Sequence, residues 1–145
     1  MKQLTRSTLL KLLMPLLYAV LTAVYFLIVL QQTPTQPHHI IGIAIVTLAF
    51  ILWIAARIQL GNSFTIGAHA KELVTIGLYS KLRHPVYYFS ILAVTGIAIF
   101  TWSIYMTVPV ILLIVIEVIR IRQEEQVLMN TFGKDYLKYK QSTWF

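Results

Sequence analysis

The stretch "PVYYFSILAVTGIAIFTWSIYMTVPVILLIVIEVI", residues 85–119, decides the fold. It holds two apolar runs, 85–100 and 104–119, which are separated only by the tripeptide TWS at 101–103. Each run is short for a membrane span, so each must borrow flanking residues or lie where the bilayer is locally thinned. Because the connection between them is so short, the sequence predicts two helices in a tight antiparallel hairpin.

Two further apolar runs, about 9–30 and 39–56, precede this hairpin. The 145 residues are 58% hydrophobic and only 12% charged, whereas roughly a quarter of the residues of a soluble domain are charged. We therefore expect an all-α integral membrane protein with about four transmembrane helices, formed by one domain that covers residues 1–145. The "QQTPTQ" segment after the first run offers no small-x-small cleavage site, which favours a retained helix over a signal peptide.

The distribution of cations predicts the topology. The loops at 31–38 and 101–103 carry no lysine or arginine, and with four spans the three basic segments share one side. The positive-inside rule makes that side the cytoplasm, together with both termini and any active site there. The net charge of +7 then indicates contact with anionic membrane lipids, and no nucleic acid partner is expected. The basic residues are Lys2, Arg6, Lys11, Arg57, Lys71, Lys81, Arg83, Arg120, Arg122, Lys134, Lys138 and Lys140.

Some site chemistries are excluded by composition. The chain has no cysteine, which rules out disulfides, thiol catalysis and thiolate metal sites. His84 has no second histidine or carboxylate at metal-ligand spacing, His38 and His39 lie on the opposite side, and His69 is expected in a loop, so no metal site is predicted.

The two long polar segments differ in pattern. Residues 57–84 read "RIQLGNSFTIGAHAKELVTIGLYSKLRH", and their three glycines predict loops with a short interfacial helix. Residues 120–140 read "RIRQEEQVLMNTFGKDYLKYK" and show a partial helical stripe. Gly133 is a plausible stop, and Tyr136 and Tyr139 share one face of a short amphipathic helix that follows it.

Charged residues around the end of the fourth apolar run stack on one helical face. Glu117, Arg120 and Glu124 are spaced by three and four residues. Glu117 lies just inside the apolar run, where a carboxylate needs a partner, and Arg120 is the obvious one. Glu125 lies about 100° around the helix from Glu124. The two adjacent acids can bind a cation, although charge patterning alone favours a solvated helix face.

Polar residues also gather where the third apolar run begins. Pro85 suits the first turn of a helix, which places His84 at the cap. Arg83 then lies at headgroup level, and Tyr87 begins an aromatic belt. This structural interpretation accounts for each residue type, but a histidine here can also bind a ligand or carry a proton.

Three ordered segments resemble the isoprenylcysteine carboxyl methyltransferase family and its relatives, the membrane phospholipid methyltransferases. "ARIQLG" (56–61) resembles the family's arginine and Leu-Gly pair. "LVTIGLYSKLRHPVY" (73–87) resembles its Leu-Val-Thr-x-Gly-x-Tyr…Arg-His-Pro-x-Tyr signature. "RIRQEEQVLMNTFGKDYLKY" (120–139) resembles its Glu-Glu-x-x-Leu-x-x-x-Phe-Gly-x-x-Tyr-x-x-Tyr block. Both long blocks, in order and flanking a helical hairpin, form a specific signal.

The resemblance implies S-adenosylmethionine (SAM) as methyl donor, enclosed by residues 73–88 and 117–139. Glu124 and Glu125 resemble the family's acidic pair, which holds the amino-acid end of the cofactor, and a carboxylate suits its ammonium. No Gly-x-Gly-x-x-Gly turn follows a strand, so a Rossmann-type site is not supported. The cofactor-binding positions carried over are Gly77, Tyr79, Arg83, His84, Tyr87, Glu124 and Glu125.

The resemblance also implies a lipid-like acceptor that enters from the bilayer. A carboxylate acceptor, as in a prenylcysteine-type molecule, needs a cation to hold it, and Arg57 or Arg120 can serve. An amine acceptor, as in a phospholipid N-methyltransferase, must lose a proton to His84 or Glu117. His84 and Arg120 are thus the candidate catalytic residues, and Arg57 and Glu117 the candidate substrate residues. A non-enzymatic four-helix membrane protein is the remaining alternative, but the uncharged middles of the spans argue against transport.

Overall fold

The computed structural model describes residues 20–32, 34–60 and 73–144, and all regular structure in these ranges is helical. Two helical stretches are long and apolar enough to cross a membrane: Pro37–Leu60 and Ile104–Phe132. Val20–Gln32 and Pro85–Thr101 are apolar but shorter. The all-α class and the membrane character are therefore confirmed, while a total of four spans stays a prediction. The part of the first predicted span before residue 20 lies outside the described residues.

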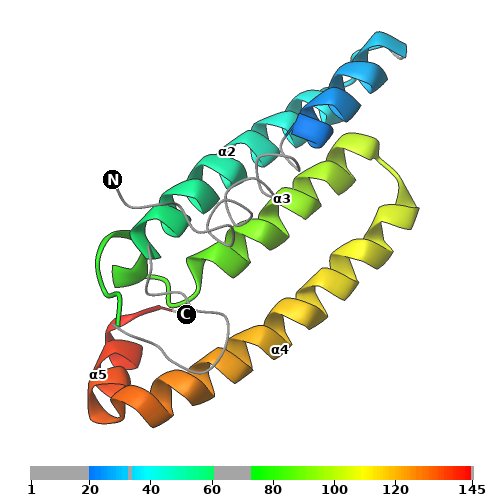
Figure 1. Ribbon diagram of the computed structural model, residues 1–145. Helices are drawn as coiled ribbons and strands as arrows, with labels where there is room; N and C mark the ends of the chain where they lie inside the picture. Colours follow the sequence, from blue (N-terminus) through cyan, green and yellow to red (C-terminus); the bar gives the residue numbers. More distant parts are fainter. Residues whose placement is uncertain (1–19, 33, 61–72, 145) are drawn as a thin grey trace, which may run out of the picture.

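Helices α2 (Pro37–Leu60) and α3 (Pro85–Thr101) pack along each other through two glycines (Figure 1). A Cβ atom on Gly42 of α2 would come 2.6 Å from the Cβ of Phe100. One on Gly96 of α3 would come 2.8 Å from Cγ2 of Val46. Both distances are too short for real atoms, so the glycines allow the two backbones to approach closely. Phe26, from the preceding helix Val20–Gln32, stacks on Phe100 with 4.0 Å between ring centroids.

The predicted hairpin is present. α3 ends at Thr101 and is capped by Trp102, which has a left-handed conformation (φ 48°) and donates its N–H to the carbonyls of Ala98 and Ile99. A short 3-10 helix, η3 (Ile104–Met106), leads into α4 (Thr107–Phe132), which runs back antiparallel to α3 (Figure 1). The tight connection between the two apolar runs thus follows from the sequence, and only the left-handed tryptophan was not anticipated.

α4 continues beyond the fourth apolar run. That run ends at Ile119, and the helix extends through the charged residues without a break to Phe132. It ends at Gly133, which has a positive φ of 50° and donates its N–H to the Met129 carbonyl at 2.9 Å. The predicted stop at Gly133 is confirmed. The twin glutamates are therefore fixed by a helix that is rooted in the apolar hairpin.

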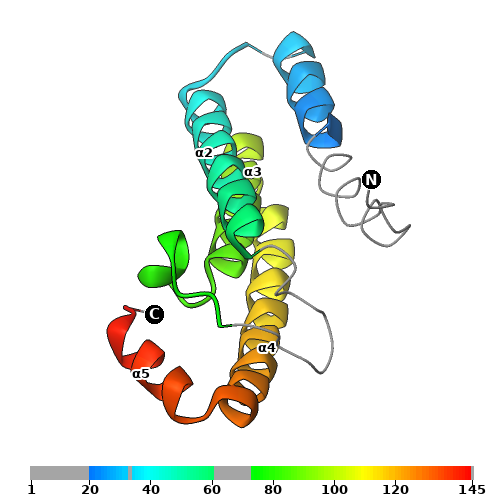
Figure 2. The same ribbon diagram turned by 60° about the vertical axis from the view of Figure 1, so that its left-hand side comes forward.

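The last helix, α5 (Lys134–Ser142), turns back toward the start of α3, as Figures 1 and 2 show from two sides. Tyr136 and Tyr139 share its buried face, as predicted. The Tyr139 hydroxyl donates to the Tyr79 carbonyl at 2.6 Å, and the Trp144 N–H donates to the Lys81 carbonyl at 2.9 Å. The tail is thereby attached to the connector rather than lying apart from it.

The connector between α2 and α3 contributes one turn of 3-10 helix, η2 (Gly77–Ser80). Gly77 has a φ of 61° and faces Gln59 of α2, whose Oε1 accepts the Leu78 N–H at 2.8 Å. Tyr79 is buried against Ala56 and Phe89, so the connector is anchored on both long helices. This packing sets the height and direction of the segment that leads into His84.

Candidate functional site

The site is built around the start of α3. His84 occupies the N-cap position with Pro85 in the first turn, and the Tyr87 N–H donates to the His84 carbonyl at 3.1 Å. The imidazole makes no capping hydrogen bond with the helix. Its backbone is therefore held by the helix start, while its side chain is available to meet α4.

The His84 ring lies between the two adjacent glutamates of α4. Its Nδ1 is 3.4 Å from Oε2 of Glu124, and its Nε2 is 3.6 Å from Oε1 of Glu125. The His84 side chain is only 3% exposed, and the two carboxylate side chains are 29% and 24% exposed. The twin glutamates thus do not form a solvated helix face, which was the interpretation that charge patterning alone favoured.

Glu125 contacts cations from two further elements. Its Oε1 is 3.5 Å from Nη1 of Arg83, just before α3, and its Oε2 accepts a hydrogen bond from Nζ of Lys140 on α5 at 3.0 Å. The sequence did not single out Lys140, because its approach depends on the turn at Gly133. One carboxylate therefore joins the start of α3, the end of α4 and the tail helix.

Tyrosines surround this cluster and remain protonated donors. Burial raises the pKa of Tyr79 and of Tyr136 above the ordinary value, and the nearby carboxylates of Glu124 and Glu125 raise them further. Burial raises the pKa of Tyr139 to about 12, against the opposing effect of the Arg83 charge. The ring of Tyr87 lies 5.9 Å from the His84 ring, centroid to centroid. These residues form an apolar wall with polar tips at the site.

Four buried polar atoms have no hydrogen-bond partner within the described residues, and all lie in or beside this cluster. They are Nε of Arg83, Nε2 of His84, Oε2 of Glu117 and the hydroxyl oxygen of Tyr136. Most buried polar groups in folded proteins are paired, so an orphaned group indicates a missing ligand or water. Two of the four atoms are donors, one is a histidine nitrogen that can donate or accept, and one is a carboxylate oxygen, a set that suits a ligand with both anionic and cationic groups.

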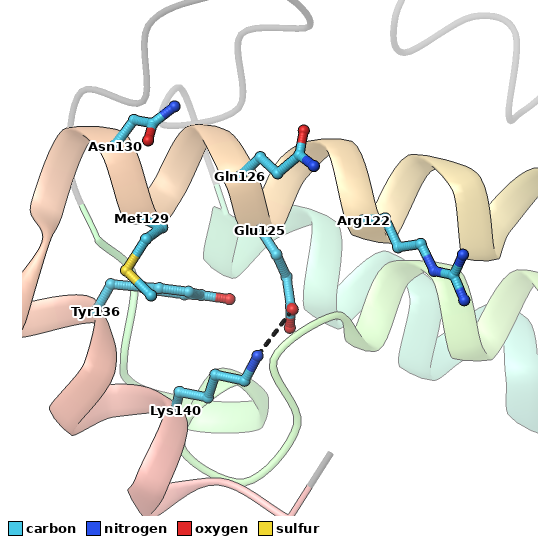
Figure 3. Close-up of a pocket in the computed structure, with 7 residues that line it drawn as sticks. All are labelled: Arg122, Glu125, Gln126, Met129, Asn130, Tyr136 and Lys140. Carbon is cyan, nitrogen blue, oxygen red and sulfur yellow. Dashed lines mark hydrogen bonds and ion pairs between the residues drawn. The ribbon is translucent and has the colours of Figure 1, made fainter.

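A pocket of about 560 Å³ opens beside the cluster, between α4 and α5. This volume lies within the usual range of small-molecule sites. In Figure 3 the Tyr136 hydroxyl and the Lys140 ammonium both point toward Glu125. The lining residues are Arg122, Glu125, Gln126, Met129, Asn130, Tyr136 and Lys140.

The other predicted site residues lie at different depths around the cluster. Gly77, in the connector, faces Gln59 of α2. The charge of Arg57 lowers the pKa of Tyr79, against the larger effect of burial. Glu117 is buried on α4, and Arg120 lies one turn further with its Nη1 3.7 Å from Oε2 of Glu117. The expected pairing of Glu117 with Arg120 is present as an ion pair, but it is too long for a hydrogen bond.

The sequence is similar to those of known proteins. Residues 37–135 match the model of the phospholipid methyltransferase family, and this range contains α2, α3 and α4 entirely. The protein-S-isoprenylcysteine O-methyltransferase of Dictyostelium discoideum is 36% identical over 84 residues, which cover 50% of this chain and 31% of that relative. The match thus spans about a third of the length of the relative. Because the family model covers more than half of the sequence, the chain belongs to the phospholipid methyltransferase family.

Proposed function

We propose that the protein is a membrane methyltransferase that transfers a methyl group from SAM to a lipid-like acceptor. The observation that carries this proposal is the meeting of Arg83 and His84 with Glu124 and Glu125, in which Nε of Arg83 and Nε2 of His84 have no hydrogen-bond partner among the described residues. Family membership supplies the reaction class. The acceptor and the cofactor remain part of the proposal.

The residues present fit SAM. Glu124 and Glu125 suit its ammonium group, since Glu125 already accepts a hydrogen bond from the Lys140 ammonium and Glu124 lies 3.4 Å from Nδ1 of His84. The orphaned Nε atom of Arg83 and Nε2 atom of His84 are donors for its carboxylate or ribose hydroxyls. The rings of Tyr79 and Tyr87 offer flat walls for the adenine, and Gly77 positions the turn that carries Tyr79. When bound, SAM supplies a methyl group on a sulfonium, which needs no further activation.

The contribution of the protein is then alignment and exclusion of water. The start of α3 and the end of α4 hold their charged side chains on rigid helices, which reduces the entropy lost when two substrates are aligned. α5 covers the cluster and is held by the Tyr139 and Trp144 hydrogen bonds. The cluster is thereby partly shielded from bulk water, with the His84 side chain only 3% exposed, which strengthens the electrostatic contacts within it.

Two classes of acceptor are compatible with this arrangement. The name of the Dictyostelium relative includes an isoprenylcysteine and O-methylation, which supports a carboxylate held by Arg57 or Arg120. The family description names phospholipids, and a buried acid beside the cluster favours an amine whose proton passes to His84 or Glu117. In either case the site faces the cytoplasm according to the distribution of cations, with both termini on that side.

A methyl-transfer screen tests the proposal. Purified protein in lipid nanodiscs is incubated with methyl-radiolabelled SAM and total membrane lipids or prenylcysteine analogues, and label in the organic phase is counted. We expect labelled lipid with the wild-type protein. The Glu125→Gln variant, which removes one charged hydrogen-bond partner, should give at least about 10-fold less label in the organic phase. An organic phase that stays unlabelled across the whole acceptor panel contradicts the proposed function.

A further inference from the structure

The wall that α4 contributes to the pocket of about 560 Å³ faces away from α3. Glu117 marks the side of α4 that packs on α3, because the Ser90 hydroxyl lies 3.0 Å from its Oε1. Arg122 follows Glu117 by five residues, which places it about 140° around the helix, and Gln126 lies about 180° around by the same count. The pocket is therefore separate from the space between α3 and α4, although Glu125 contributes to both.

Two cations enter this pocket from different helices. Arg122 comes from α4 and Lys140 from α5, as Figure 3 shows. Arg83 and Arg120 each approach a glutamate, but Arg122 makes no ion pair within the described residues. Lys140 has three N–H donors, of which one is directed to Glu125, and its side chain is 42% exposed. Donors for an anion therefore remain on both sides of the pocket.

The rest of the polar lining is also compatible with an anion. Glu125 is the one acid among the described residues that line the pocket, and its charge is already balanced by contacts with Lys140 and Arg83. The side-chain amides of Gln126 and Asn130 can donate to and accept from hydroxyl groups. Two cations, one paired acid and two amides suit an anionic group that also carries hydroxyls.

An exposed apolar stripe on α4 leads into the pocket. Ile111, Val115 and Val118 precede Arg122 at intervals of four, three and four residues, which is the spacing of one helical face. Their exposed fractions are 59%, 50% and 40%. Only 6% of the most apolar stretch of this helix is buried within the described residues. Acyl chains cover such a stripe in a bilayer, and the arginine that follows it lies at the level of the headgroups.

We propose that the pocket between α4 and α5 binds an anionic glycerophospholipid with a hydroxylated headgroup, of the kind represented by phosphatidylglycerol. Its acyl chains lie along the exposed stripe, and its phosphate accepts hydrogen bonds from Arg122 and Lys140. The headgroup hydroxyls contact the amides of Gln126 and Asn130. The lipid is a bound ligand that connects α4 to α5 and takes no part in methyl transfer, so the inference is independent of the proposed function.

Other occupants fit this surface less well. A symmetric dimer formed through the stripe would place the same residues of two copies face to face, and the two Arg122 guanidinium groups would repel each other. A soluble phosphate ester would leave the apolar stripe uncovered. A choline lipid would bring its own ammonium group beside two cations. An anionic lipid complements both the charge of the pocket and the apolar surface next to it.

Native mass spectrometry of the full-length protein tests the proposal. The protein is released from nanodiscs that contain equal parts of phosphatidylglycerol and phosphatidylcholine, and the mass gives the retained lipids and the oligomeric state. The variant is Arg122→Gln, at an exposed position. Lys138→Gln is the matched control, because it removes the same charge from an exposed position of α5 outside the pocket. Calorimetry with S-adenosylhomocysteine, the demethylated cofactor, is run on each protein.

We expect the wild-type protein to retain phosphatidylglycerol in preference to phosphatidylcholine. Arg122→Gln should reduce the retained phosphatidylglycerol at least about 10-fold, as for the loss of a charged hydrogen bond. Lys138→Gln should reduce it about 5-fold at most, which is the effect of one cation on the diffuse attraction of anionic lipids. Both variants should bind S-adenosylhomocysteine as the wild type does, since neither side chain belongs to the cluster around His84.

Four results would overturn the inference. Equal retention of the two lipids by the wild type would show that the pocket does not select a charge. Equal losses in Arg122→Gln and Lys138→Gln would show diffuse attraction without a site. Displacement of the lipid by soluble glycerol phosphate would remove the role of the stripe. Weaker binding of S-adenosylhomocysteine by Arg122→Gln alone would assign the pocket to the cofactor.

Discussion

Removal of the Tyr139 hydroxyl tests how the tail helix is held over the site. The hydroxyl donates to the Tyr79 carbonyl at 2.6 Å, and both side chains are buried. Tyr139→Phe keeps the ring but leaves this acceptor unsatisfied, which costs about 1–3 kcal/mol. The Lys140–Glu125 contact and the Trp144 hydrogen bond remain, so α5 should open more often without being lost.

The predicted loss corresponds to about 5-fold to about 150-fold more frequent opening of α5. Hydrogen–deuterium exchange, read by mass spectrometry over residues 134–144, measures this opening directly. Peptides from α2 and α3 should exchange as in the wild type. Tyr105→Phe is the matched control, because that side chain is 83% exposed at the opposite end of α4. Unchanged exchange of α5 in Tyr139→Phe, or an equal rise in α2, would refute the reasoning.

Two further predictions follow from the same segments. Gly77→Ala should lower the melting temperature more than Gly133→Ala. Both glycines have positive φ values, at which alanine costs roughly 1–2 kcal/mol. Only at Gly77 would the new Cβ also come 2.5 Å from Oε1 of Gln59. Equal shifts in thermal unfolding would show that the Gln59 contact carries no weight. Alkaline pH should destabilise the fold between about 10 and 12. There the phenol of an unfolded chain ionises while Tyr139, with its pKa of about 12, stays protonated, so the unfolded state binds fewer protons and stability falls as pH rises. Tyr139→Phe should lose this part of the pH dependence, and a denaturant titration at each pH measures it.

The apolar patterns predicted the helices better than they predicted the site. The run 85–119 contains the hairpin because its short connection leaves no other arrangement, and Gly133 ended a helix as expected. The charged residues after Ile119 end the apolar surface without ending the helix, which continues to Phe132. Only the family resemblance predicted that His84 lies close to Glu124 and Glu125. These residues are some forty positions apart in the sequence, and the hairpin brings them together.

The partners that the sequence did not reveal depend on tertiary structure. Lys140 reaches Glu125 only because α5 turns back at Gly133. Ser90 appeared to be a single small polar residue within an apolar run, and nothing in its spacing links it to Glu117. Such contacts require the relative rotation of α3 and α4, which periodicity does not contain.

The central claim is that the start of α3 and the end of α4 enclose one cofactor. Calorimetric titration of the purified protein with S-adenosylhomocysteine tests it most directly. We expect saturable binding that Glu125→Gln weakens about 10-fold to about 150-fold, as expected for the loss of one charged hydrogen bond, and that Asp135→Asn, at an exposed position of α5, leaves unchanged. No heat of binding with the wild type, or equal affinity in the wild type and Glu125→Gln, would contradict it.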